Sequence, residues 1–187
     1  MQLNCIRRLR FRVRPALSVA VVGCLVAAGW APVRADAVYF IVRHAEKAGE
    51  PESDPPLSEK GKRRAEDLKR VLRSIKIDAV FSTGFNRTNQ TVEQVAKPRD
   101  LVVSEIPIHA TAKFVKILRA RYKDQTVLIA GHSNTVPELI KQLGVPEEQV
   151  PEVTEKDYDN LFIVTVSEEG QASLTHLHYG EADEESD

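Results

Sequence analysis

The sequence predicts a three-layer α/β/α sandwich with a mostly parallel central sheet. Short apolar runs alternate along the chain with longer segments whose apolar residues recur at helical spacing. The first run, 37–42, is continuous and rich in β-branched and aromatic residues, which is typical of a strand covered on both faces. Alternation of this kind favours helices on both faces of a parallel sheet. The runs that we expect to form strands are 37–42, 78–82, 101–104, 126–130, 161–166 and 172–177.

Ser58 is expected to cap the first helix, because a serine hydroxyl accepts hydrogen bonds from the free N–H groups of a first turn. The helix itself is predicted from apolar residues at helical spacing, namely Ala65, Leu68, Val71 and Leu72. A second helix is expected over 87–96, stopped by Pro98. A third is expected over 113–122, with Phe114, Ile117 and Leu118 facing inward, and a fourth over 136–143, ended by Gly144.

The first 35 residues have the layout of a secretory signal peptide. A basic stretch without acidic residues precedes an apolar run over 16–31, and residues 33–35 offer small side chains at the cleavage positions. We therefore expect cleavage after Ala35 and a periplasmic or secreted protein. One alternative is an uncleaved membrane anchor, although the apolar run is shorter than the roughly 20 residues that span a bilayer. The other alternative is lipoprotein processing at Cys24.

After this segment we expect one domain over 36–180 and a disordered acidic tail over 181–187. Six of the 26 basic residues and none of the 27 acidic residues lie before residue 36, so the remainder has a net charge of about −7. That balance favours neither nucleic acid nor an anionic membrane surface as a partner. Both cysteines, Cys5 and Cys24, lie in the predicted signal peptide, so a processed chain would hold neither a disulfide nor a thiolate site.

Polar side chains follow the ends of the predicted strands. The first strand ends at Arg43 and His44, the second leads into a helix that Arg87 opens, the third ends at Glu105, and the fourth ends at residues 131–134. Because ligands bind beyond the carboxyl ends of the strands in such a sheet, we expect these residues at one mouth. Each of them alone has a purely structural explanation. Four of them at four strand ends indicate a site.

This set of residue types is suited to phosphoryl transfer. Guanidinium groups bind phosphate through paired hydrogen bonds. A histidine can attack phosphorus and form a covalent phosphoenzyme, and a carboxylic acid can protonate the leaving oxygen. The helix that begins near Asn86 adds N–H donors at its positive end. The residues therefore predict a phosphate site around Arg43 and His44.

Three ordered segments resemble the histidine phosphatase superfamily. Residues 43–46 (Arg-His-Ala-Glu) followed by 57–61 (Leu-Ser-Glu-Lys-Gly) are similar to the family's R-H-G/A-E and L-[ST]-x-x-G motifs. Residues 82–91 are similar to its second segment, with one extra residue between the serine and the arginine. Residues 131–134 (Gly-His-Ser-Asn) resemble the segment that carries the second histidine. The resemblance covers essentially all of 37–167 and implies a phosphoglycerate mutase-like fold.

The resemblance also implies roles for individual residues. His44 would be the nucleophile, and Arg43, Arg87 and His132 would hold the equatorial phosphate oxygens. No metal and no cofactor are implied. Ala45 stands where the larger members of the family have glycine, as in the short phosphohistidine-phosphatase-like members.

The proton donor implied by the family is Glu105, with Asp54 as the alternative. Glu46 is expected to pair with a basic side chain beside the motif, and Asn134 is expected among the residues that bind substrate. A donor of this kind would protonate the oxygen of the leaving group.

We therefore expect an exported phosphomonoesterase that works through a phosphohistidine on His44. Its substrate would be a phosphorylated small molecule or an envelope phosphate ester, because only seven residues separate Glu105 from the next predicted helix and leave no long covering insertion. The alternatives are a phosphohistidine-protein phosphatase and a non-catalytic protein that binds phosphorylated ligands. The remaining histidines, His109, His176 and His178, are expected to be structural.

Overall fold

The structure is a computed structural model, and it describes residues 36–49, 53–107 and 109–183. The predicted signal peptide, with both cysteines, and residues 184–187 of the predicted acidic tail lie outside the described residues. Everything below concerns the described part of the chain, which belongs to one compact unit.

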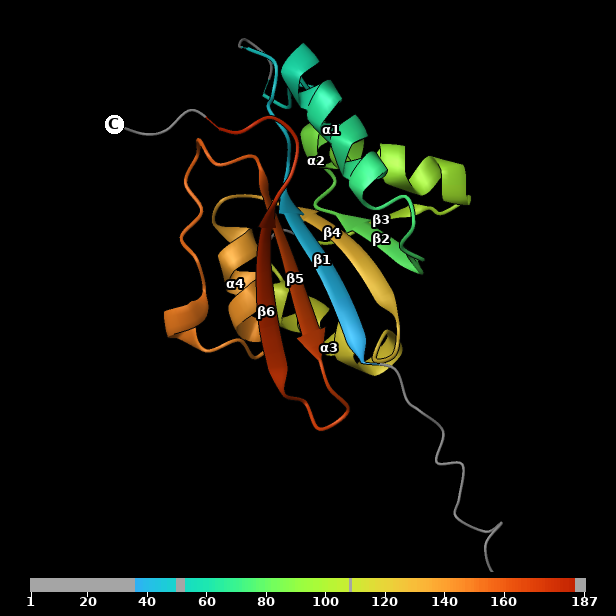
Figure 1. Cartoon of the computed structure of the whole chain (residues 1–187), viewed down its shortest axis with the longest axis vertical. Helices are drawn as coiled ribbons and strands as arrows, with labels where there is room; N and C mark the ends of the chain where they lie inside the picture. The colour runs from blue at the N-terminus through green and yellow to red at the C-terminus, as the bar shows by residue number, and fades with distance from the viewer. Residues whose placement is uncertain (1–35, 50–52, 108, 184–187) are drawn as a thin grey trace, which may run out of the picture. The chain divides into compact units, whose positions relative to one another are not determined.

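A six-stranded mixed sheet forms the centre of the fold (Figure 1). Its strand order is β3-β2-β4-β1-β5-β6. The first four strands in this order are parallel, β5 is antiparallel to β1, and β6 is antiparallel to β5. This arrangement confirms the predicted mostly parallel sheet. The strands are β1 (Ala37–Arg43), β2 (Ala79–Ser82), β3 (Val103–Glu105), β4 (Thr126–Gly131), β5 (Asn160–Val166) and β6 (Ala172–His178).

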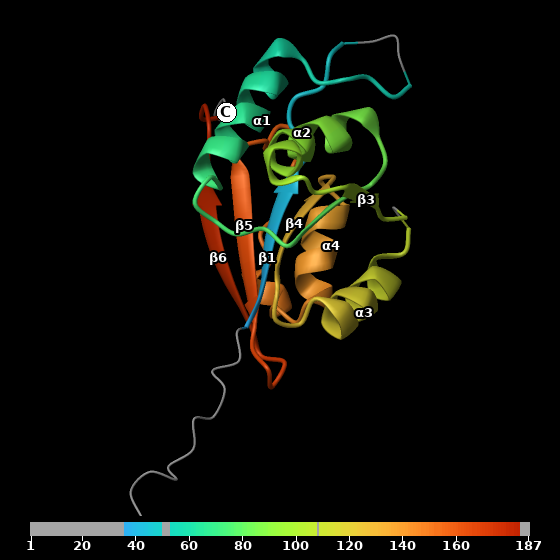
Figure 2. The same ribbon diagram turned by 90° about the vertical axis from the view of Figure 1, so that its right-hand side faces the viewer.

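Helices cover both faces of the sheet, as the predicted three-layer sandwich requires. The helices are α1 (Glu59–Val71), α2 (Asn86–Ala96), α3 (Thr111–Arg121) and α4 (Thr135–Gln142). Two hydrophobic cores result, and Figure 2 shows α1 beside α2 and α3 beside α4. Successive β1 residues alternate between the cores: Phe40 and Val42 pack with α1 and α2, whereas Tyr39 and Ile41 pack with α3 and α4.

Ser58 caps α1 as predicted, because its Oγ accepts a 3.0 Å hydrogen bond from the Gly61 N–H. Two residues that the sequence predicts to face the core are exposed instead, so these predictions are wrong. Val71 is 49% exposed at the last residue of α1, and Ile117 is 39% exposed on α3, where Val115 packs inward instead. The second helix ends at Ala96 as predicted, and Pro98 lies in the 3₁₀ turn Lys97–Arg99 that follows it.

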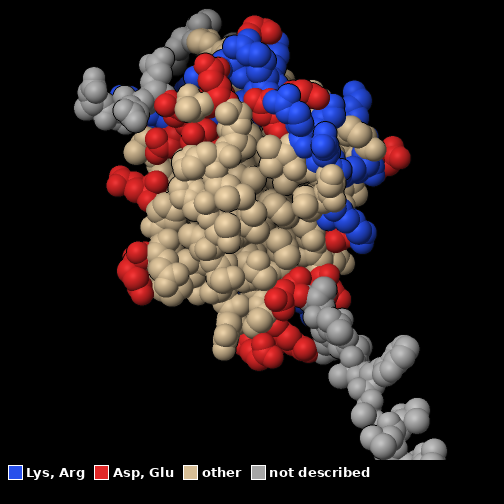
Figure 3. All heavy atoms as spheres, in the orientation of Figure 1, with Lys and Arg blue, Asp and Glu red and all other residues tan. Residues whose placement is uncertain are grey.

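Charged side chains are distributed unevenly over the surface. Figure 3 shows basic residues over α1, which carries Lys60, Lys62, Arg63 and Lys69 among others, and a largely uncharged area where β1, β5 and β6 face the viewer. Within the described ranges, no helix is long and apolar enough to span a bilayer.

Candidate active site

A pocket lies at the carboxyl ends of the parallel strands, where the sequence predicts a site. It is lined by His44, Lys47, Arg87, His132, Ser133, Asn134 and Glu155. β1, β2 and β4 are neighbours in the sheet, so the segments that follow them meet at this edge. Four predicted residues, His44, Arg87, His132 and Asn134, thus line a single pocket.

Arg43 lies beneath the pocket wall and is 1% exposed. Its Nη1 donates to the carbonyl oxygen of Thr154 at 2.8 Å, and its Nη2 donates to Glu155 Oε2 at 2.7 Å. The guanidinium also lies 4.1 Å from the centre of the Tyr158 ring, in a cation–π contact. A buried cation with a fixed orientation results, and it faces a segment that lies far away in the sequence.

His44 is buried and held in one tautomer. Its backbone N–H donates to the carbonyl oxygen of Gly131 at 2.9 Å, which fixes the end of β1 against β4. Its Nδ1 lies 2.8 Å from the carbonyl oxygen of Ala45, so Nδ1 carries the hydrogen and Nε2 keeps its lone pair. Burial, aided by the charge of Arg43, lowers the pKa of His44 from 6.5 to about 4. His44 is therefore a neutral imidazole at pH 7 with its lone pair on Nε2.

His132 lies beside His44, with 5.3 Å between the ring centres. Its Nε2 lies 2.8 Å from Thr83 Oγ1, and Thr83 Oγ1 lies 3.1 Å from Thr88 Oγ1. Thr88 gives its hydroxyl hydrogen to the carbonyl oxygen of Phe85, so Thr83 donates to Thr88 and accepts from His132. The hydrogen of neutral His132 is thereby assigned to Nε2. Burial, and then the charges of Arg87 and Arg43, lower the pKa of His132 to about 4.

Arg87 lies in the first turn of α2, and its side chain lines the pocket. Its guanidinium lies 4.4 Å from the centre of the Phe85 ring, and its Nη1 lies 3.5 Å from Asp54 Oδ1. The same Asp54 carboxylate accepts the Asn86 N–H at 3.0 and 3.1 Å. Asp54, the alternative donor, thus supplies negative charge at the positive end of α2. It restrains Arg87 from outside the pocket.

Glu105 lies on the edge strand β3, and it does not belong to the pocket lining. Its side chain packs against Gly84, where an added Cβ would come within 2.6 Å of the Glu105 carboxyl carbon. Gly84 has a φ of +83°, a conformation that favours glycine. The contact places the carboxylate one residue from Thr83, the partner of His132. Its assignment as the proton donor stays a prediction.

The sequence analysis missed two residues of the pocket lining, Lys47 and Glu155. Glu155 Oε2 accepts from Arg43, and its Oε1 accepts from the Ser133 hydroxyl. The residue belongs to a charged loop between α4 and β5 and lies more than a hundred positions from Arg43. No periodicity or motif marks this carboxylate among the acidic residues near it, so the sequence contains no signal for its position.

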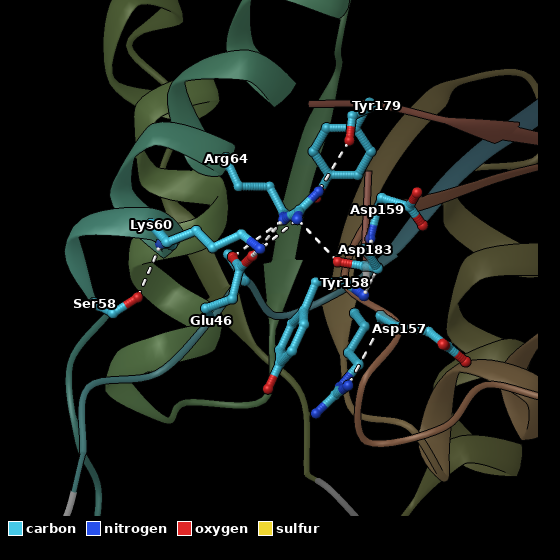
Figure 4. Close-up of polar contacts among 12 residues, drawn as sticks. Glu46, Ser58, Lys60, Arg64, Asp157, Tyr158, Asp159, Tyr179 and Asp183 are labelled. Carbon is cyan, nitrogen blue, oxygen red and sulfur yellow. Dashed lines mark hydrogen bonds and ion pairs between the residues drawn. The ribbon is translucent and has the colours of Figure 1, made fainter. Parts of the chain in front are cut away.

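Glu46 pairs with a basic side chain beside the motif, as predicted, and that side chain is Arg64 of α1 (Figure 4). Arg64 Nε lies 3.0 Å from both carboxylate oxygens, and its Nη2 lies 2.8 Å from Glu46 Oε1 and 3.0 Å from Asp183 Oδ1. Asp183 Oδ2 in turn accepts the backbone N–H groups of Tyr158 and Asp159. This buried network ties the 43–46 segment to α1 and to the loop that carries Glu155.

The other histidines lie outside the pocket lining. His176 Nε2 lies 2.6 Å from Asn160 Oδ1 and its ring packs on Phe162, while His178 pairs with Asp159 at 3.0 Å. His109 is exposed. Within the described ranges, no three His, Cys, Asp or Glu side chains are grouped so that they could hold a metal ion.

The comparisons with known proteins agree with this geometry. Residues 39–114 match the family model of the histidine phosphatase superfamily (branch 1). No curated protein sequence matches the chain.

Three solved structures share the fold. The protein histidine phosphatase SixA complexed with tungstate matches with a TM-score of 0.64 and 24% identity, over 75% of this chain and 96% of that chain. A putative alpha-ribazole-5'-P phosphatase from Escherichia coli matches with a TM-score of 0.62 and 18% identity, over 76% of this chain and 96% of that chain. A mycobacterial glucosyl-3-phosphoglycerate phosphatase matches with a TM-score of 0.60 and 14% identity, over 74% of this chain and 97% of that chain. At these identities the likeness establishes the fold, and it confirms the predicted fold class.

Proposed function

We propose that this chain belongs to the histidine phosphatase superfamily (branch 1), whose family model matches residues 39–114, and that it hydrolyses phosphate monoesters through a phosphohistidine on His44. The observation that carries the proposal is the state of His44. It is a buried, neutral imidazole whose Nδ1 hydrogen is engaged, so that Nε2 is available for attack. Arg87 and His132 line the same pocket, and Arg43 lies directly beneath it.

In the first step His44 Nε2 attacks phosphorus, the new N–P bond forms and the bond from phosphorus to the ester oxygen breaks. The leaving oxygen takes a proton from a carboxylic acid, for which Glu105 is the proposed residue. In the second step water attacks phosphorus and gives a proton to the carboxylate formed in the first step, the N–P bond breaks, and inorganic phosphate and His44 are released. Arg43 and Arg87 stabilise the charge on the three equatorial oxygens in both steps.

We further propose that the protein is exported through the N-terminal segment, so that its substrates are phosphorylated small molecules or envelope phosphate esters. The support for export is the basic and apolar layout of residues 1–35. N-terminal sequencing of the protein recovered from the secreting cell tests it. A chain that begins at Asp36 is expected, and a chain that still carries residues 1–35 in the cytoplasmic fraction contradicts export.

A second candidate is phosphohistidine-protein phosphatase activity, which is favoured by two of the similar structures, both described as SixA proteins. A pocket whose wall includes the exposed Lys47 and Asn134 admits a phosphate that protrudes from a protein surface. A third candidate is a protein that binds phosphorylated ligands without turnover. Hydrolysis rates on a panel of phosphate esters and phosphohistidine distinguish these two candidates from the main proposal. A phosphohistidine-protein phosphatase hydrolyses phosphohistidine faster than the esters, and a binding protein hydrolyses neither.

The decisive experiment is hydrolysis of p-nitrophenyl phosphate by the wild type and by His44→Ala. His176→Ala is the matched control, because that histidine lies outside the pocket lining. We expect the His44 variant to lose activity and the control to keep it. Alkaline quench of the wild type during turnover is expected to trap an acid-labile, base-stable phosphate on His44. Equal rates for both histidine variants, or no hydrolysis of any ester or phosphohistidine, would refute the proposal.

A further inference from the structure

Glu155 has no part in the reaction described above, yet its carboxylate lies in the pocket. It comes from residues 151–159, a segment between α4 and β5 that we call the covering segment. The carboxylate accepts hydrogen bonds from Arg43 Nη2 at 2.7 Å and from the Ser133 hydroxyl. A carboxylate of the pocket lining thus already accepts a hydrogen bond from Arg43.

A phosphate bound at His44 needs the same guanidinium. Arg43 Nη1 is already engaged by the carbonyl oxygens of Thr154 and Asp157, at 2.8 and 3.3 Å. Nη2 and Nε remain available to a phosphate, because Nε has no hydrogen-bond partner in the structure and Nη2 has a second N–H group. A phosphate that accepts from either nitrogen lies close to the Glu155 carboxylate, and two neighbouring anions repel each other in a partly buried site. Substrate phosphate and the Glu155 carboxylate therefore compete for Arg43.

The covering segment is anchored through its backbone, whereas the Glu155 side chain is largely exposed. The backbone N–H groups of Tyr158 and Asp159 are bound by Asp183, whose other oxygen pairs with the buried Arg64 (Figure 4). Glu155, by contrast, is 77% exposed. Its side chain can rotate away without disturbing the anchored backbone. After rotation the carboxylate stays tethered at the mouth, close to the leaving group of a bound ester, because the effective concentration of a tethered group is high.

We propose that Glu155 is a specificity-determining residue that competes with substrate phosphate for Arg43 and selects against esters with a second negative charge beside the phosphate. This inference rests on the proposed function, since it takes the pocket at His44 to be the phosphate site. A neutral or cationic leaving group meets no penalty from the displaced carboxylate. An anionic leaving group meets repulsion from it.

The first test is calorimetric titration of the full chain with inorganic phosphate at pH 7.5. Glu155→Gln keeps the shape of the side chain and removes the charge, and Glu152→Gln is the matched control because it makes the same charge change in the same exposed segment. We expect Glu155→Gln to bind phosphate about tenfold more tightly, equivalent to about 1.4 kcal/mol, and Glu152→Gln to match the wild type. Unchanged or weaker binding by Glu155→Gln overturns the competition.

The second test compares phenyl phosphate with 3-carboxyphenyl phosphate, two esters of similar shape that differ in the charge of the leaving group. We expect Glu155→Gln to raise kcat/KM more for the carboxylated ester, by about fivefold beyond its gain on phenyl phosphate. An equal gain on both esters overturns the selectivity. If the wild type hydrolyses neither ester, the proposed function fails. The two esters are then titrated as ligands, and the same ratio is read from their dissociation constants.

Discussion

His132 Nε2 lies 2.8 Å from Thr83 Oγ1, and the Thr83 hydroxyl gives its own hydrogen to Thr88. The neutral imidazole of His132 therefore carries its hydrogen on Nε2 and has its lone pair on Nδ1. A lone pair cannot donate to a phosphate oxygen, so His132 must gain a proton at Nδ1 before it can stabilise phosphate charge. The relationship between the threonine pair and the histidine links phosphate binding to proton uptake.

Replacement of Thr83 by valine is expected to lower kcat about tenfold, because the His132 ring loses the hydrogen-bond partner that fixes its orientation in the pocket. Thr83→Ser, which keeps the hydroxyl, is expected to restore most of the rate. Steady-state kinetics with p-nitrophenyl phosphate measure both variants. A serine variant as slow as the valine variant would show that the methyl group, and not the hydrogen bond, is what matters.

Local patterns in the sequence predicted most of the fold, since each strand end and cap depends on neighbouring residues. Ser58 and the run 37–42 are examples. The errors arise where a pattern offers more apolar positions than a helix can bury. Four apolar residues of α3, at 114, 115, 117 and 118, compete for the inner face, and only packing in the core that α3 shares with α4 and the sheet decides that position 117 is exposed.

The site shows the same division between local and long-range determinants. Arg43, His44, Arg87 and His132 follow strands or open helices, so the order of elements along the chain was enough to bring them together. Glu155 reaches Arg43 through a loop whose path is set by the network of Asp183 and Arg64. Such a path depends on contacts between residues that lie far apart in the sequence, and no local pattern encodes it.

Stability is expected to fall as the pH drops from about 6.5 toward 4. Burial lowers the pKa values of His44 and His132 to about 4 in the folded protein, against 6.5 for a free imidazole. Between these values the unfolded chain binds more protons than the folded chain, so the free energy of unfolding decreases with falling pH. The loss reaches up to about 3 kcal/mol for each histidine, at about 1.4 kcal/mol per pKa unit.

Urea denaturation at pH 7.5 and pH 5 measures this slope. A His44→Asn variant removes one of the two titrating groups and is expected to show a smaller loss between the two pH values. Equal losses in the variant and the wild type would mean that His44 titrates alike in both states of the chain.

Glu46→Gln is expected to destabilise the fold by about 3 kcal/mol, because it removes the charge partner of a guanidinium that is 2% exposed. Glu66→Gln is the matched control, since Glu66 pairs with Lys69 on the exposed surface of α1 and contributes less than about 1 kcal/mol. Denaturant titration gives both values. A Glu46 variant as stable as the control would show that Asp183 alone satisfies Arg64.

Arg87→Gln is expected to lower kcat/KM for p-nitrophenyl phosphate by about a hundredfold or more, because a donor to the transition-state charge is lost. Arg70→Gln serves as the control: Arg70 lies on α1, is 69% exposed and is not among the pocket residues. It is expected to leave the rate unchanged. Similar rates for the two variants would place the phosphate oxygens out of reach of Arg87.

Glu105→Gln is expected to slow esters with poor leaving groups far more than activated ones, because an alkoxide needs a proton as it departs whereas p-nitrophenolate does not. The carboxylate packs on Gly84, one residue from the Thr83 that contacts His132, so it stands near the pocket without lining it. Asp54→Asn is the matched comparison, since Asp54 caps α2 and contacts Arg87. An alkyl phosphate and p-nitrophenyl phosphate are assayed with both variants. If Glu105→Gln slows the two esters equally and Asp54→Asn slows only the alkyl ester, then Asp54 is the donor and Glu105 serves to shape the Gly84 turn.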